Sequence, residues 1–157
     1  MTNSPDRPLD AREDHLWQSY LHLYRELIGV LEARLAGASG LSGAEYVILE
    51  PLSKAQNGAL RTKELRQLVG WEKSRVSHQV SRMARNGLVV REDYEGDGRG
   101  SMVRLTDVGR TTIEAARPSY LEAVRGYLLA RLSRDEQDTL AALLDRVRNG
   151  LPASGLN

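Results

Sequence analysis

The chain has 157 residues, which is enough for one well-filled core and too few for two ordinary domains. With 41% hydrophobic and 27% charged residues its composition is that of a soluble globular protein, and no apolar run approaches the roughly 20 residues that cross a bilayer. The absence of cysteine excludes disulfides, zinc–thiolate sites and thiol redox sensing. Because the N-terminus is polar and acidic, unlike a secretory signal, we expect a cytoplasmic protein that does not enter a membrane.

The net charge of +1 hides an uneven distribution along the chain. Residues 61–91 contain eight Lys or Arg and only two acidic residues, a net charge of +6. Such asymmetry in a small protein suggests that one face meets a polyanion while the rest stays soluble. A merely solvated charged surface is the alternative.

The first half of the chain predicts three helices. Apolar residues at three- and four-residue spacings predict a long helix over about 9–35, and their stripe is broad enough to contact both its own domain and a second copy. Ser42 and Glu45 form a capping box for a second helix that reaches Leu52. Thr62 is expected to cap a short helix over 63–68 that Gly70 ends.

The second half predicts a helix over 72–86, a β-hairpin and two more helices. Segments 88–92 and 101–106 are rich in β-branched residues and flank a glycine-rich turn, which is typical of a hairpin. Thr106 should cap a long helix that reaches Leu132, and Pro118 should kink or split it. A capping box at Ser133 starts the last helix. Its expected buried side consists of Leu140, Leu143, Leu144 and Val147.

This order of elements predicts a mainly α fold with a small β-hairpin wing, a winged helix-turn-helix. On the helix over 72–86, Val76, Val80 and Met83 share the sector that faces a core, and the opposite side is basic and hydroxyl-bearing without an acidic residue. Such a face fits phosphates and base edges, although a basic surface helix without a ligand is the alternative. The side chains expected to touch DNA from this helix are Lys73, Ser74, Arg75, Ser77, His78 and Arg82.

Flanking elements add further candidate DNA contacts. Lys63 and Arg66, on the preceding helix, are placed to contact phosphates. Arg99, at the hairpin tip, is expected to enter a minor groove, where narrow A·T-rich segments attract arginine. Asp97 either orients a nearby arginine or backbone amide or only forms the turn.

Residues 71–110 resemble the DNA-binding core of the MarR family, the multiple-antibiotic-resistance type of transcriptional regulators. The resemblance rests on the fourth helix, on three short motifs and on the layout of the flanking helices. The motifs are G-L-V at Gly87, Leu88 and Val89, D-x-R at Asp97 and Arg99, and L-T-x-x-G at Leu105, Thr106 and Gly109.

The resemblance implies a homodimer that binds a pseudo-palindromic operator in double-stranded DNA, commonly as a repressor that a small aromatic or phenolic effector releases. Within one structural domain, residues 41–106 would then form the DNA-binding region, and 1–36 with 107–157 the helical dimerisation region. Because the family's oxidant sensors use cysteine, the sequence excludes that branch.

Aromatic residues at helical spacing suggest a place for an effector. Trp17, Tyr20 and Tyr24 on the first helix, with Tyr46 on the second, could line a cavity, and His22 or Arg25 could hold a carboxylate there. The alternative is that these rings are ordinary core residues. We expect no cofactor and no metal, since His15 and His22 lie seven residues apart, and no catalytic motif indicates an enzyme. A winged-helix protein-interaction module and a metal-responsive regulator are the alternative functions.

Overall fold

A computed structural model describes residues 7–94 and 100–152, with the side chains of 93 and 94 left aside. Within these ranges the chain forms α-helices, short 3₁₀ turns and three strands. The elements in chain order are α1 (Ala11–Ser39), α2 (Gly43–Lys54), η1 (Gln56–Gly58), β1 (Ala59–Arg61), α3 (Thr62–Val69), α4 (Lys73–Arg85), β2 (Val89–Tyr94), β3 (Gly100–Leu105), α5 (Asp107–Tyr127), η2 (Leu129–Arg131) and α6 (Arg134–Asn149). The mainly α winged helix-turn-helix is therefore confirmed.

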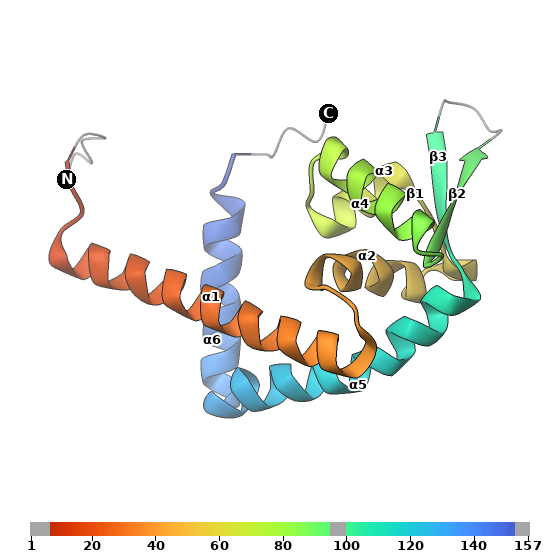
Figure 1. Cartoon of the computed structure of the whole chain (residues 1–157). Helices are drawn as coiled ribbons and strands as arrows, with labels where there is room; N and C mark the ends of the chain where they lie inside the picture. Colours follow the sequence, from red (N-terminus) through yellow and green to blue (C-terminus); the bar gives the residue numbers. More distant parts are fainter. Residues whose placement is uncertain (1–6, 95–99, 153–157) are drawn as a thin grey trace.

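Helices α2, α3 and α4 gather with the sheet into one block, which we call the head (Figure 1). Helix α5, which we call the arm, leaves the base of the sheet and runs beneath the head and α1. The sheet is antiparallel with the order β1-β3-β2, and Leu60 in β1 pairs with Val103 in β3. Strand β1 was not expected, because three residues are too short to show a period of two.

One core joins the head to α1 and to the first half of the arm. Side chains at most 1% exposed come from α1, each helix of the head, the sheet and α5. They include Leu35, Ile48, Leu49, Leu65, Met83, Val103 and Ile113. The head and the near ends of α1 and α5 therefore fold as one unit.

Most of the expected helix starts are confirmed. The Ser42 and Ser133 capping boxes are both formed, and the Thr106 hydroxyl accepts a hydrogen bond of 2.9 Å from the Gly109 amide. The prediction for Thr62 was wrong, because it lies inside α3. Its hydroxyl instead donates to the Ser101 carbonyl in β3 at 2.8 Å, which ties α3 to the sheet.

Helix α5 ends at Tyr127, before the expected Leu132. Of the two effects expected from Pro118, a kink or a split, the split does not occur, because the helix continues through this residue. The glycine of the L-T-x-x-G motif has a steric role, since a Cβ on Gly109 would collide with the Leu88 carbonyl oxygen. Close approach of the arm to the root of β2 therefore requires glycine at this position.

The predicted buried side of α6 was wrong for the single chain, because no residue of this fully described helix is buried. Leu143, Leu144 and Val147 are 46%, 52% and 66% exposed. The first half of α1 is likewise uncovered, and in Figure 1 it projects away from the head. The periodicity of the sequence identified the apolar faces of α1 and α6 correctly, but it could not show that these faces are exposed to solvent in the single chain. In the described ranges, no helix combines the length and apolarity that a membrane span requires.

Candidate nucleic-acid interface

Helix α4 is held on the head by the residues expected to anchor it. Val76, Val80 and Met83 are at most 1% exposed and belong to the common core. Gly87, with a φ of 73°, follows the helix and turns the chain into β2. Because one face is packed in this way, the opposite face points away from the core.

The outer face of α4 presents most of the predicted DNA-contacting groups to solvent. Ser74, His78 and Arg82 are exposed, as is Lys73 at the helix start, whereas Ser77 is half-buried at the edge of the face. No acidic residue occurs between Lys73 and Arg85. The arrangement offers hydroxyl, imidazole and guanidinium donors from one rigid element, which is what base edges and phosphates require.

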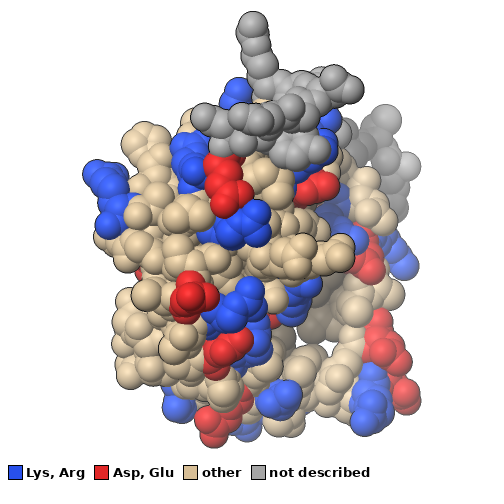
Figure 2. All heavy atoms as spheres, turned by 90° about the vertical axis from the view of Figure 1, so that its right-hand side faces the viewer, with Lys and Arg blue, Asp and Glu red and all other residues tan. Residues whose placement is uncertain are grey.

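A basic residue from the wing extends this surface. The Arg91 guanidinium on β2 donates to the Ser81 hydroxyl of α4 at 3.2 Å, and Arg85 donates to the Ser81 carbonyl at 3.4 Å. Sequence reasoning placed Arg91 in the basic segment but not among the contacting residues, because its position depends on how β2 packs against α4. Seen from the wing side, the molecule carries Lys and Arg together with acidic side chains (Figure 2). This face as a whole therefore carries charges of both signs, whereas α4 itself bears basic residues and no acidic one.

An ion pair joins the two strands of the wing, β2 and β3, near the end that adjoins the head. Arg104 on β3 makes two hydrogen bonds to the Glu92 carboxylate on β2, at 2.8 and 3.0 Å, and a third to the Asn57 carbonyl at 3.2 Å. These bonds lower the pKa of the Glu92 carboxyl, so the pair is charged at neutral pH. The predicted tip residues Asp97 and Arg99 lie outside the described residues.

On α3, the two predicted phosphate contacts differ. Lys63 is exposed, whereas Arg66 is half-buried. Its Nε is buried and has no hydrogen-bond partner in the part of the chain that the structure describes. Lys63 is therefore the freer of the two to reach a phosphate.

Arg75 departs from the pattern of its neighbours on α4. Its guanidinium carbon lies 3.9 Å from the centroid of the Trp71 ring, a cation–π arrangement. Both side chains line a cavity of about 300 Å³ between the head, α1 and the arm. The other lining residues are Tyr24, Ile28, Leu31, Glu32, Leu35, Gly43, Ala44, Tyr46, Val47 and Tyr120. A residue predicted for DNA contact is thus also the cationic side chain of this cavity.

The predicted aromatic cavity is present in part. Tyr24 and Tyr46 line it, but Trp17 and Tyr20 do not; they are about half exposed and stack along the outside of α1, with centroids 5.9 Å apart. The predicted His22 and Arg25 are also exposed on α1 and are not among its lining residues. Helical spacing grouped these side chains by sequence, whereas the cavity is lined by α1 only from Tyr24, near its middle, to Leu35.

Sequence reasoning missed Trp71 and Tyr120. Tyr46 and Tyr120 stack with centroids 4.2 Å apart across the junction of α2 and α5, and burial is the main cause that raises the pKa of Tyr46 to about 12. In contrast, Trp71 lies in the connection between α3 and α4, and Arg75 lies in the first turn of α4, so their contact depends on how this connection folds back on the helix.

No group of three or more His, Asp or Glu side chains is arranged to hold a metal ion in 7–94 and 100–152.

Residues 39–100 match the sequence model of the MarR family. The chain is similar to Sco3205 of Streptomyces coelicolor, a MarR family transcriptional regulator solved in complex with DNA, with 33% identity, a TM-score of 0.88 and coverage of 95% of this chain and 94% of that one.

Two further relatives agree with this match. AbsC of Streptomyces coelicolor, also a MarR family transcriptional regulator, is 31% identical with a TM-score of 0.85, over 91% of this chain and 96% of that one. YdgJ of Bacillus subtilis, an HTH-type transcriptional regulator, is 27% identical over 78% of this chain and 73% of its own length. The relatives are thus regulators and not enzymes.

Proposed function

Since this chain belongs to the MarR family of transcriptional regulators, we propose that it is a ligand-responsive repressor that binds a pseudo-palindromic operator as a homodimer. The observation that carries the proposal is the outer face of α4, which is packed from behind and bears only neutral and basic polar groups in front. The similarity to a DNA-bound regulator over 94% of that chain supports it.

Two kinds of DNA contact are proposed, one to base edges and one to phosphates. Arg82, with Ser74 and His78, faces base edges in the major groove, where a well-made two-pronged contact discriminates by about 1–3 kcal/mol. Lys63 and Lys73 contact phosphates, which fixes the orientation of the head and makes binding weaken as salt rises.

A second copy is the proposed cover for the apolar faces of α6 and of the first half of α1. Fully burying a Leu or Val side chain contributes about 1.5–3 kcal/mol. Several half-exposed side chains on these helices can therefore supply a stable interface. A two-fold dimer would present two α4 helices to half-sites about one helical turn, roughly 34 Å, apart.

The proposed effector is a small aromatic or phenolic anion in the 300 Å³ cavity. Trp71 and Tyr46 offer ring faces, and Arg75 offers the positive charge. Because the cavity lies where head, α1 and arm meet, an occupant would change how the head sits on the arm. Two half-sites cannot both be engaged when the spacing of the heads is wrong.

The first experiment tests DNA readout with Arg82→Ala, using Arg12→Ala on exposed α1 as the matched control for charge. The probe is the duplex that the wild-type protein enriches from a random library, called the selected duplex below. We expect Arg82→Ala to weaken binding by about 1–3 kcal/mol while the control binds as the wild type does. Unchanged affinity in Arg82→Ala would refute readout through this face of α4, and a wild type that enriches no duplex would instead favour a protein-interaction module.

The second experiment tests the dimer and the effector site separately. Leu144→Asp should give a monomer in light scattering, whereas Ala142→Asp, on the polar side of α6, should leave the dimer intact. Arg75→Met should weaken binding of benzoate much more than that of phenol, because only benzoate is charged at neutral pH. Equal losses for both probes would show that Arg75 does not act through charge.

A further inference from the structure

The contact between α2 in the head and the arm contains an ion pair that the DNA-binding surface does not use. Arg117 on α5 donates to the Glu50 carboxylate on α2 from Nε at 3.2 Å and from Nη2 at 3.0 Å. Nη2 also donates to the Ser53 hydroxyl at 2.6 Å. The side chains of Glu50 and Arg117 are only 21% and 30% exposed, so solvent screens this pair less than a surface pair.

Each partner of this ion pair stands immediately before a proline inside a helix. Glu50 precedes Pro51 in α2, and Arg117 precedes Pro118 in α5. A proline lacks the amide that would bond to the carbonyl four residues earlier, and it disfavours the helical conformation of the residue before it. Both helices nevertheless continue through their prolines. The ion pair therefore joins two turns that each contain a proline and so lack one helical hydrogen bond.

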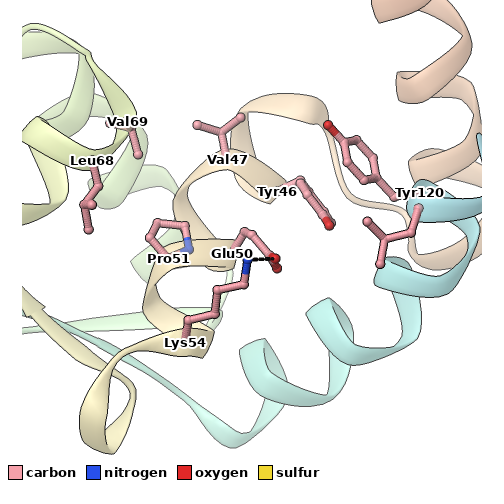
Figure 3. Close-up of a pocket in the computed structure, with 9 residues that line it drawn as sticks. Tyr46, Val47, Glu50, Pro51, Lys54, Leu68, Val69 and Tyr120 are labelled. Carbon is pink, nitrogen blue, oxygen red and sulfur yellow. Dashed lines mark ion pairs between the residues drawn. The ribbon is translucent and has the colours of Figure 1, made fainter. Parts of the chain in front are cut away.

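Packing gives this junction little support on one side. A cavity of about 450 Å³ is bordered by Glu50, Pro51 and Lys54, and the ion pair drawn in Figure 3 is that of Glu50 with Lys54. Its other lining residues are Tyr46, Val47, Leu68, Val69, Tyr120 and Leu121. The stacked rings of Tyr46 and Tyr120 pack α2 against α5, and beside the cavity, where fewer atoms oppose movement, the ion pair adds directional bonds between the two helices.

Lys54 contacts the same carboxylate but cannot hold the two helices together. Its ammonium lies 2.7 Å from Glu50 Oε1, yet it belongs to α2 and is 70% exposed. It therefore pairs within one helix, whereas Arg117 pairs between two. This difference makes Lys54 a matched control.

We propose that Glu50 and Arg117 brace a hinge formed at Pro51 and Pro118, and thereby set the angle between head and arm. The inference rests on the proposed function, because in the dimer this angle determines the separation of the two α4 helices. Glu50 and Arg117 are positioning residues, since neither lies on the outer face of α4.

The first test measures the angle without DNA. The chain has no cysteine, so Gln67→Cys in the head and Arg125→Cys at the far end of the arm can carry the only two spin labels. Labelled protein is mixed with a large excess of unlabelled protein, so that the distance measured is within one chain. We expect a broader distance distribution in Glu50→Gln than in the wild type, and an unchanged one in Lys54→Met.

A rescue variant separates a hinge from general loosening. Pro118→Ala restores the missing amide to α5, so Glu50→Gln combined with Pro118→Ala should give a narrower distribution than Glu50→Gln alone. The single and double changes of Glu50 and Arg117 to Gln should broaden it equally, since either change removes the same pair. The proposal is refuted if Glu50→Gln leaves the distribution as narrow as in the wild type.

The second test links the brace to operator geometry. Glu50→Gln should bind the complete selected duplex about tenfold more weakly, yet bind a duplex with only one half-site as the wild type does. It should also lose less affinity than the wild type when one base pair is inserted between the half-sites. Equal losses on the complete and the half-site duplex would refute a positioning role. If the wild type binds no DNA, the proposed function fails, and the distance measurement still decides the brace.

Discussion

Replacing Gly109 by alanine should destabilise the whole fold, because the arm touches the root of β2 at this residue. The new Cβ would overlap the Leu88 carbonyl oxygen and lie 2.9 Å from Leu105 Cδ1. The carbonyl cannot easily retreat, since it accepts hydrogen bonds from the Thr106 amide at 3.2 Å and from the Thr106 hydroxyl at 3.0 Å. Overpacking costs about 1–3 kcal/mol, and each weakened hydrogen bond adds about 1 kcal/mol.

Against this cost, alanine is favoured over glycine inside a helix by about 1 kcal/mol. The net expectation is a loss of about 2–4 kcal/mol in the free energy of unfolding, or about 10 °C in Tm for a chain of this size. Urea unfolding followed by circular dichroism at 222 nm measures the first quantity, and a thermal scan the second.

Gly126 in the same helix provides the matched control. A Cβ there would meet no atom within 4 Å, so Gly126→Ala should stabilise the protein by about 0.5–1 kcal/mol. A Gly109→Ala protein within about 1 kcal/mol of the wild type would refute the steric account of the L-T-x-x-G motif.

Three further predictions concern titration and capping. Burial raises the pKa of the Glu50 carboxyl, but hydrogen bonds from Lys54 and Arg117 outweigh it and leave the pKa below the usual 4.5. The stability lost in Glu50→Gln should therefore be constant above pH 4.5 and shrink as the pH falls through the lowered pKa, in urea titrations at each pH. Because the pKa of Tyr46 is raised to about 12, the wild type should lose stability as the pH rises from the ordinary tyrosine value of 10 toward 12, and Tyr46→Phe should lose less over that interval. Thr106→Val should cost about 1–2 kcal/mol of unfolding free energy by removing the cap of α5, and an equally stable variant would show that the Gly109 amide finds another acceptor.

The parts of the fold that follow from local rules could be predicted from the sequence. Val76, Val80 and Met83 occupy one sector of a helix because of its period, and they are buried as that period indicates. Capping by Ser42 and Thr106 could also be predicted from the sequence, since the accepting hydroxyl and the donating amide lie within one turn. Thr62 failed as a cap because its hydroxyl found a partner 39 residues away, in β3.

The candidate site was predictable only where one element carries it. The outer face of α4 could be drawn on a helical wheel, but the cavity combines residues from four helices and the α3–α4 connection. Arg75 lies at the edge of that wheel, and its position could favour either DNA or Trp71. In the structure Arg75 lies against Trp71. The helical wheel therefore predicted its exposure correctly but could not predict its contact with Trp71.

Local patterns also cannot identify what covers an apolar face. Met83 on α4 and Leu144 on α6 occur at the same helical spacing among polar residues, yet the first is fully buried and the second is 52% exposed. The difference arises because α4 is enclosed by α2, α3 and β2, whereas α6 follows a 3₁₀ turn that carries it away from the head. A helix without a partner in its own chain gains little from its apolar face. If a second copy covers it, as we propose, the stability of α6 depends on protein concentration while that of the head does not.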